Sequence, residues 1–496
     1  MISRILVACR GEIALRIVRA ARECGVETVV AHSQADANSL AAQLANYKIC
    51  IGPNTAKDSY LNIDAMLNAA HIYDCSAVYP GYGFLSESAQ FARKCKEDGL
   101  IFIGPSAEVI EEMGSKSQAR ENAEKAGVPV VPGSDGVLKN AQEGLEVAKR
   151  VGYPVLIKAV SGGGGRGMRA CHNDEELLKN FETASAEAKA CFNDDRLYLE
   201  KLIINPKHIE FQIIGDTHGN VVHLGERDCS IQRNHQKMIE ETPSKAISPD
   251  LREEMGMHAV ALAKSVGYTG AGTIEYVLDS NGAKDGNPPK FYFIEMNTRI
   301  QVEHPITEEV YGVNLVREQL RIASGLRLSV KQEEVVPRGH AIECRINAED
   351  PAKNFRPSPG KTPFVHFPGG CGIRVDSALY SGGEISPYYD SLAAKIITFA
   401  PTRLEAIRKM RSALFEVHVD NIPTTCELLY GITWHPDFLK GKYDTSFIAK
   451  NMDDILMWLD ITDAADAQAA KSTTAISASA SECALLGNAD MSRQAD

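Results

Sequence analysis

The chain has 496 residues, 44% hydrophobic and 24% charged, a profile typical of a globular protein with about three domains. Its net charge of -12, with the two signs well mixed, argues against a nucleic-acid-binding surface, and no apolar run approaches the ~20 residues that span a bilayer. The 12 cysteines occur singly, without a Cys-x-x-Cys pair, so neither a zinc site nor a disulfide framework is predicted. An apolar strand begins at Ile5 with no signal or transit segment before it, so we expect a complete, cytoplasmic chain.

The first region, residues 1–113, has the pattern of alternating strands and helices. Residues 4–31 predict a strand, a turn at Arg10-Gly11-Glu12, a helix and a second strand, with Gly25 as the stop signal of the helix. Further apolar strands are predicted near residues 77–79 and 101–103. Short alternating units of this kind predict an α/β domain with a doubly wound parallel sheet.

The second region, residues 114–330, starts with a predicted helix at about 116–126 and contains a glycine run, Gly162 to Gly165 with Arg166 and Gly167. The run matches G-x-G-x-x-G literally, but a strand rather than a helix follows it, so a dinucleotide fingerprint is rejected. No P-loop pattern is present. The run is therefore predicted to be the tip of a hairpin, within a lid of about residues 131–203.

A glycine hairpin can fold over phosphates because its backbone N–H groups approach the oxygens closely. The alternative is a mobile surface loop without a ligand. Lys158, at the end of the supporting strand, and Arg166 favour a nucleotide lid that shields a reactive intermediate from water.

The segment 291–305 carries the most informative pattern. If it is extended, the side chains of alternate residues share one face, and these are Glu295, Asn297, Arg299, Gln301 and Glu303. Met296, Ile300 and Val302 would take the buried face. A solvated polar face is the alternative, which the apolar residues 291–294 disfavour.

A second carboxylate, Glu275, lies on the preceding predicted strand, and antiparallel pairing would place it near Glu295. Two carboxylates and the amide oxygen of Asn297 are ligands that suit magnesium held together with ATP phosphates. An exposed glutamate pair without a metal is the alternative.

Arg299 can bind a small planar oxyanion through two parallel hydrogen bonds, and Glu303 can act as a general base beside it. Gln232, His235 and Lys237 are further candidates for phosphate or anion contacts, although each alone is a weak signal.

The third region, residues 331–450, is predicted to be α+β, with short strands before an amphipathic helix at about 403–415. Residues 451–496 form an Ala/Ser-rich tail that we expect to be disordered.

Five long motifs resemble those of biotin carboxylases, members of the ATP-grasp superfamily, over about residues 2–450. They are Arg10-Gly-Glu-Ile-Ala14, Tyr79-Pro-Gly-Tyr-Gly-Phe-Leu-Ser-Glu87, Glu226-Arg-Asp-Cys-Ser230, Glu295-Met-Asn-Thr-Arg-Ile-Gln-Val-Glu-His304 and Glu343-Cys-Arg-Ile-Asn-Ala-Glu349. The resemblance implies a three-domain ATP-grasp fold with a mobile glycine-hairpin lid, in a homodimer.

The resemblance also implies a role for each matching residue. The nucleotide-binding set is Lys116, Lys158, Gly163, Gly164, Gly165, Glu200, Lys201, Ile203, His208, Gln232 and His235. The metal ligands are Glu275, Glu295 and Asn297, for Mg²⁺ or Mn²⁺. The bicarbonate pocket is Lys237, Arg299, Gln301 and Val302, with Glu303 as the base and Arg345 stabilising the biotin enolate.

The implied reaction is the ATP- and bicarbonate-dependent carboxylation of biotin through carboxyphosphate. No Ala-Met-Lys-Met-like biotinylation segment is present, so the biotin is expected on a separate carrier protein, with a separate carboxyltransferase subunit, as in acetyl-CoA carboxylase or split pyruvate carboxylase. The final acyl acceptor stays open. Two alternatives are another ATP-grasp ligase that forms an acyl phosphate and a non-catalytic ATP-binding subunit.

Overall fold

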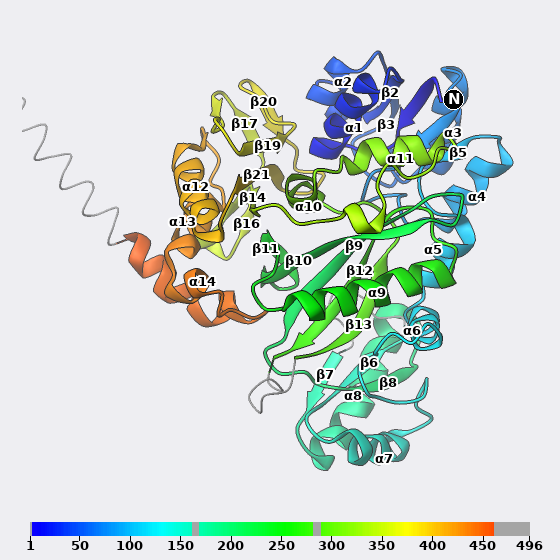
Figure 1. The fold of residues 1–496 in the computed structure, drawn as a ribbon, viewed down its shortest axis with the longest axis vertical. Coiled ribbons are helices and arrows are strands. Elements are labelled where there is room, and N and C mark those ends of the chain that lie inside the picture. Colours follow the sequence, from blue (N-terminus) through cyan, green and yellow to red (C-terminus); the bar gives the residue numbers. More distant parts are fainter. Residues whose placement is uncertain (1, 161–167, 281–288, 461–496) are drawn as a thin grey trace, which may run out of the picture.

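The computed structural model describes residues 2–160, 168–280 and 289–460. Four bodies of secondary structure are visible in Figure 1: the N-terminal region, a small lid, a central sheet with its helices, and a C-terminal region. The glycine-run residues Gly163, Gly164 and Gly165, together with Arg166, lie outside the described residues.

The N-terminal region contains a parallel sheet with helices on both faces, as expected. Its strand order is β3-β2-β1-β4-β5, from β1 (Arg4–Val7), β2 (Glu27–Ser33), β3 (Tyr47–Gly52), β4 (Ala77–Tyr79) and β5 (Ile101–Phe102). Its helices are α1 (Gly11–Glu23), α2 (Leu40–Leu44), α3 (Ile63–Ile72), α4 (Ala89–Glu97) and α5 (Ala107–Gly114). Val7 and Leu6, which are consecutive in β1, enter different cores on the two faces. Each face therefore needs its own helices, which is the reason for the double winding.

The lid has a three-stranded sheet and a separate core. Helix α6 (Lys116–Lys125) precedes it, and its elements are α7 (Ala141–Val151), β6 (Val155–Ala159), β7 (Met168–Cys171), α8 (Asp174–Phe192) and β8 (Leu197–Lys201). Strands β6 and β7 pair antiparallel with Lys158 opposite Met168, and Asn173 caps α8. The prediction of a strand on each side of the glycine run, and of a helix only afterwards, is thus confirmed.

One antiparallel sheet of eight strands joins the central and C-terminal regions. Its order is β13-β12-β9-β10-β11-β14-β21-β19. The strands are β9 (Lys207–Gly215), β10 (Val221–Arg233), β11 (Gln236–Thr242), β12 (Gly270–Asp279), β13 (Lys290–Asn297), β14 (His340–Asn347), β19 (Ile373–Ser377) and β21 (Leu392–Ala400). The strand pairing therefore crosses residue 331, where the sequence suggests a new region.

Helices cover the large sheet on both sides. They are α9 (Pro249–Ser265), α10 (His304–Tyr311), α11 (Leu315–Ala323), α12 (Arg403–Glu416), α13 (Cys426–Trp434) and α14 (Pro436–Lys440). Short strands complete the C-terminal region: β15 (Glu349–Asp350), β16 (Arg356–Pro357), β17 (Gly360–Thr362), β18 (Val365–His366), β20 (Gly383–Ile385) and β22 (His418–Val419). Helix α9 covers the face of β9, β10 and β12 that Figure 1 presents.

The segment expected to be extended from 295 to 303 is extended only as far as Asn297, so that prediction is wrong in its second half. Residues 298–302 form a loop, and Glu303 is the N-cap of α10. Pro305 stands in the first turn of α10, where its missing N–H costs no hydrogen bond. Ile300 enters the core against the N-terminal sheet, which draws the chain away from the strand.

The tail begins later than expected. Residues 447–460 are helical, and Ile455 is buried in the C-terminal core, so residues 451–460 belong to the folded part. Apolar residues at helical spacing, Met452, Ile455, Leu456 and Leu459, explain this correction. Residues 461–496 lie outside the described range.

A buried ion cluster anchors the C-terminal region to β11. Arg403 of α12 donates hydrogen bonds to Glu241 over 2.7 and 3.0 Å, and His340 Nε2 lies 2.7 Å from the same carboxylate. Burial favours the neutral acid, but the two partners outweigh it and hold the pKa of Glu241 well below its usual value.

Glu241→Gln is therefore expected to lower the free energy of unfolding by about 3 kcal/mol near pH 7. The native pKa is depressed, so this contribution is complete above the unfolded pKa of ~4.3 and is lost as the pH falls below it. Urea unfolding should be measured near pH 7 and at a pH below ~4.3. The difference in the free energy of unfolding between the variant and the wild type should be smaller at the acidic pH. The exposed Glu254→Gln is the control, and an equal gap at both pH values would contradict the assignment.

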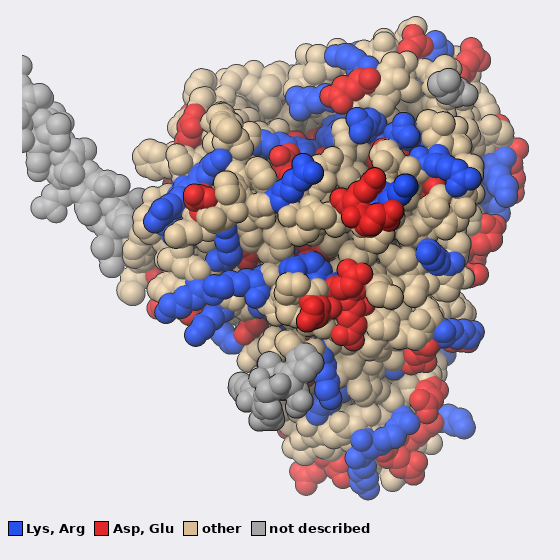
Figure 2. Space-filling model, in the orientation of Figure 1, with Lys and Arg blue, Asp and Glu red and all other residues tan. Residues whose placement is uncertain are grey.

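Acidic and basic side chains are intermingled over the face shown in Figure 2. None of the helices within the described ranges is both long and apolar enough to cross a membrane.

Candidate active site

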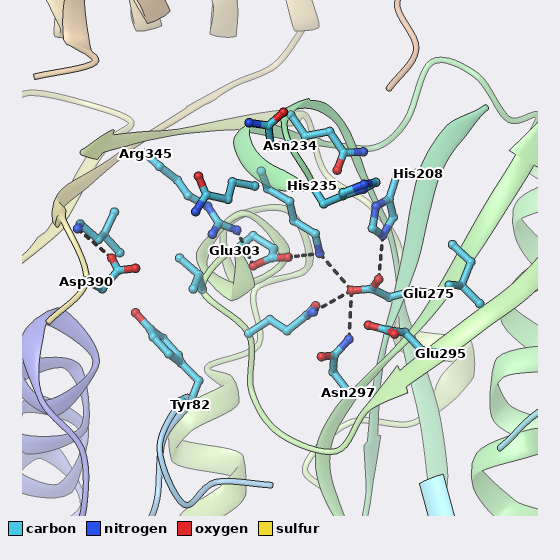
Figure 3. Close-up of a pocket in the computed structure, with 18 of the residues that line it drawn as sticks. Tyr82, His208, Asn234, His235, Glu275, Glu295, Asn297, Glu303, Arg345 and Asp390 are labelled. Atoms are coloured by element: carbon cyan, nitrogen blue, oxygen red, sulfur yellow. Dashed lines mark hydrogen bonds and ion pairs between the residues drawn. The ribbon is translucent and has the colours of Figure 1, made fainter. Parts of the chain in front are cut away.

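A cleft of about 1160 Å³ lies where the lid, the central sheet and the N- and C-terminal regions meet. Lys158 and Tyr198 from the lid, Tyr82 from the N-terminal region and Arg345 and Asp390 from the C-terminal region contribute to its walls. Figure 3 shows how Glu275, Glu295 and Asn297 lie on two neighbouring strands while Glu303 and Arg345 face them from the other side. Groups from the whole length of the chain thus share one cavity.

The lid end of the cleft holds the expected nucleotide residues. Lys116, Lys158, Glu200, Lys201 and Ile203 line one continuous hollow between the lid sheet and β12–β13. Lys158 forms an ion pair with Glu200, whereas Lys201 donates to the carbonyls of residues 152 and 153 over 2.9 and 2.7 Å. The ammonium group of Lys201 therefore supports the lid backbone, and the apolar Ile203 side chain remains available to a ligand ring.

Lys237 stands at the centre of three carboxylates. Its Nζ contacts Glu210, Glu275 Oε1 at 3.1 Å and Glu303 Oε1 at 2.6 Å. Burial would favour the neutral amine, but the three acids outweigh it and raise the pKa of Lys237 well above its usual value. Lys237 therefore stays charged, and it is the cation around which the acidic groups gather.

Glu303 is 2% exposed and lies between two cations. Its Oε2 accepts a hydrogen bond of 2.9 Å from Arg345 Nη2, in addition to the contact of Oε1 with Lys237. Burial disfavours the carboxylate, yet Lys237 and Arg345 prevail and hold the pKa of Glu303 well below its usual value. Glu303 is thus ionised and able to accept a proton once a bound anion competes for Lys237.

Glu275 and Glu295 are directly opposite each other in the β12–β13 ladder, as the predicted antiparallel pairing requires. Glu275 accepts hydrogen bonds of 3.0 Å from both Asn297 Nδ2 and Gln301 Nε2, and His208 Nε2 lies 2.9 Å from its other oxygen. Burial, followed by the charge of Glu275, raises the pKa of Glu295. A divalent cation would relieve this repulsion between like charges, so the pair and the nearby amide fit a hard-oxygen metal site.

Arg299 extends from the loop after β13 and is held by Glu87, a residue to which sequence reasoning assigned no role. Its Nε donates to Glu87 Oε2 over 2.8 Å, and its Nη2 donates to Asn297 Oδ1 over 3.1 Å. Lys237, Arg299, Gln301, Val302 and Glu303 all line the same cleft. Val302 thus faces the cleft and not the buried layer that alternation predicted.

The amide of Gln301 is oriented by a buried arginine that sequence reasoning missed. Arg227 is fully buried, and its five N–H groups bind Glu210, Gln212, Thr307, Thr273 and Gln301. Gln301 Oε1 receives one of these bonds at 2.9 Å. The motif Glu226-Arg-Asp-Cys-Ser230 contains this residue. The neighbouring sequence, however, does not indicate that its hydrogen-bond acceptors come from β9, β12, α10 and the loop after β13.

The remaining expected residues also lie at the cleft. Gln232 and His235 line it at the β10–β11 turn, where His235 adopts a φ of 65°, and Arg345 enters from β14. Tyr82 and Asp390, which sequence reasoning did not select, line the same side as Arg345.

Three family models match consecutive parts of the chain. They are the biotin carboxylase N-terminal domain at residues 1–110, the carbamoyl-phosphate synthase L chain ATP-binding domain at 115–331 and the biotin carboxylase C-terminal domain at 343–450.

Relatives and solved structures match over most of the chain. A biotin carboxylase of Nostoc sp. is 54% identical over 445 residues, which covers 90% of this chain and 98% of the relative. The biotin carboxylase domain dimer of Hydrogenobacter thermophilus 2-oxoglutarate carboxylase, in complex with MgADP, ADP and bicarbonate, superposes with a TM-score of 0.85 at 48% identity, covering 92% of this chain and 99% of that one. The biotin carboxylase subunit of a pyruvate carboxylase gives 0.81 at 49% identity, with the same coverage.

Proposed function

The chain belongs to the biotin carboxylase family, whose members carboxylate biotin with ATP and bicarbonate, and we propose how the residues of its cleft carry out this reaction. The observation that carries the assignment is the position of Glu303, an ionised and buried base between Lys237 and Arg345. Bicarbonate is an anion that Lys237 can bind in competition with Glu303.

In the first step, bicarbonate binds to Lys237 and Arg299 near Gln301 and Val302. Its negative charge draws Lys237 away from Glu303, so the proton affinity of Glu303 rises and the bicarbonate proton passes to it. The freed carboxylate oxygen attacks the γ-phosphorus of ATP, the bond to the β-phosphate oxygen breaks, and ADP leaves with the electron pair. The product is carboxyphosphate.

The nucleotide is held along the lid end of the cleft. Lys116 and Lys158 stabilise the transferred phosphoryl group, Glu200, Lys201 and Ile203 contact the base, and His208, Gln232 and His235 make further contacts. Glu275, Glu295 and Asn297 would hold Mg²⁺ or Mn²⁺, which neutralises phosphate charge. The family resemblance assigns Gly163, Gly164 and Gly165 to nucleotide binding as well, and they lie outside the described residues.

In the second step, carboxyphosphate releases CO₂ inside the closed cleft. The phosphate removes the proton from N1′ of biotin, the nitrogen attacks CO₂, and Arg345 donates hydrogen bonds to the ureido oxygen on which negative charge develops. Arg345 is suited to this because its planar guanidinium offers donors in a fixed geometry.

We infer that the biotin arrives on a separate carrier protein, because the chain covers 98% of the Nostoc biotin carboxylase and 99% of the biotin carboxylase subunit of a pyruvate carboxylase. A carboxyltransferase subunit would then pass the carboxyl group to the final acceptor. A homodimer is proposed by analogy with the dimeric domain of the Hydrogenobacter enzyme.

The activity is tested by measuring ADP release with and without bicarbonate, and then with free biotin. Bicarbonate-dependent ADP release that biotin stimulates by about tenfold, together with acid-labile radiocarbon on biotin, is the expected result. ATP cleavage that ignores biotin and responds to another carboxylate acceptor would favour a different ATP-grasp ligase, and absence of any cleavage would favour a non-catalytic subunit.

A further inference from the structure

Two buried glutamates lie next to Arg345 and have no part in the proposed reaction. Glu240 of β11 and Glu343 of β14 are directly opposite each other in the antiparallel ladder, and both are fully buried. Opposite residues in such a ladder place their side chains on the same face of the sheet, close enough to touch. Arg345 follows on this same face, two residues after Glu343.

Glu240 holds Arg345 from the side away from the cleft. The Nε of Arg345 donates to Glu240 Oε1 over 2.6 Å, and its Nη2 lies 2.5 Å from the same oxygen. The same Nη2 donates to Glu303 Oε2 over 2.9 Å. One guanidinium is thus shared between an anchor, Glu240, and the proposed base, Glu303.

Glu343 has the environment of a neutral acid. Within the described part of the chain, neither of its oxygens has a hydrogen-bond partner, and Glu240 Oε2 also has none. The nearby ammonium of Lys395, opposite Arg345 on β21, is already bound to Glu12 Oε1 and to the carbonyl of Val302. A buried carboxylate without partners is costly, whereas a protonated one can serve as a donor.

The charges around the pair agree with this description. Burial raises the pKa of Glu343 well above its usual value, and Glu240 and Glu303 act in the same direction while Lys395 and Arg345 oppose them. Burial also raises the pKa of Glu240 to about 7, against the effect of Arg345. The charge of Glu303 adds to this rise in the pKa of Glu240, and that of Lys237 opposes it. Two adjacent acids in such a site retain a proton between them.

We propose that Glu240 is the positioning residue of Arg345, and that Glu343 supports it as a protonated acid that donates its hydrogen to Glu240 Oε2. The proposal rests on the function assigned above. When Glu303 takes the bicarbonate proton, it loses the charge that attracts Nη2. Arg345, still anchored through Nε by Glu240, then turns Nη2 towards the biotin oxygen. The pair thereby links proton abstraction in the first step to oxyanion stabilisation in the second.

The test compares two rates in the full chain: bicarbonate-dependent ADP release without biotin and the same reaction with saturating free biotin. In Glu240→Gln, the biotin-stimulated rate is expected to fall at least about tenfold more than the biotin-independent rate, with a higher KM for biotin. Glu241→Gln is the matched control, because it makes the same change on the opposite face of the same strand. Its ratio of the two rates should stay within about twofold of the wild type at a temperature where circular dichroism shows it folded.

Equal losses in both rates for Glu240→Gln, or an equal change of ratio in Glu241→Gln, would overturn the positioning role. If Glu240→Gln does not fold, Glu343→Leu removes the donor and leaves Glu240 in place. It is expected to change the ratio in the same direction by at least about threefold, and an unchanged ratio would refute the proposal. A wild-type chain without bicarbonate-dependent ADP release would instead overturn the proposed function.

Glu343→Gln tests the protonated state separately. The amide keeps a donor for Glu240, so the rate ratio should stay within about twofold of the wild type. The wild type must retain a proton that its unfolded chain releases above pH ~4.3, so its stability falls with rising pH relative to the variant. The Tm of Glu343→Gln minus the Tm of the wild type should therefore increase from pH 6 to pH 8. A constant difference would contradict a neutral Glu343.

Discussion

Glu303→Gln is expected to lower bicarbonate-dependent ATP cleavage by about 10²- to 10⁴-fold, because the amide cannot accept the bicarbonate proton. ATP binding should change by less than about threefold, since Glu303 does not line the lid end of the cleft, where Glu200, Lys201 and Ile203 lie. The fold should persist. Lys237 retains Glu210 and Glu275 as partners, and Arg345 retains Glu240.

The measurement is ADP release as a function of bicarbonate, alongside equilibrium binding of ATP. Glu309→Gln is the matched control, because it makes the same change on α10 outside the lining of the cleft. Turnover of Glu303→Gln within about threefold of the wild type would remove Glu303 from the role of base.

Arg227→Leu is expected to lower the free energy of unfolding by about 3–5 kcal/mol, because it leaves the buried Glu210 without the arginine that balances it. Removal of the five donors also releases Gln212, Thr273, Thr307 and Gln301 from a common partner. Gln301 would no longer be held against Glu275, so the remaining folded protein should also lose activity.

Urea unfolding with an activity assay at low denaturant checks this prediction. Arg227→Lys keeps the charge but not the planar fork, so an intermediate loss of about 2 kcal/mol is expected. Arg233→Met, later on the same strand and at its exposed end, should cost less than about 1 kcal/mol. A stable, active Arg227→Leu would show that Gln301 is positioned by its other contacts alone.

The strands and helices that carry the proposed site residues could be predicted in part, because they belong to local patterns. The periodicity in residues 4–31 predicted β1, α1 and β2, and strands on both sides of the glycine run predicted a hairpin. Glu275 was expected near Glu295 because the two predicted strands follow each other in the chain and would pair antiparallel, and the register confirms this pairing.

Other features could not be predicted from local patterns. The alternation of faces was expected to continue past Asn297. The chain leaves the strand there because Ile300 packs against the N-terminal sheet, and α10 begins directly after Glu303. Arg299, Gln301 and Glu303 nevertheless line the same cleft, because the loop after β13 and the N-terminus of α10 place them there.

The sequence by itself determined the succession of elements, the chemistry of the residues from 295 to 303 and the family resemblance, because each depends on neighbours along the chain. The tertiary structure alone decided which charges meet. Glu240 and Arg345 touch because β11 and β14 are adjacent in an eight-stranded sheet, although about a hundred residues separate them in the chain. Strand order in a sheet is set by the packing of the cores on its two faces. The sequence around a single buried glutamate does not show which strand will lie beside it.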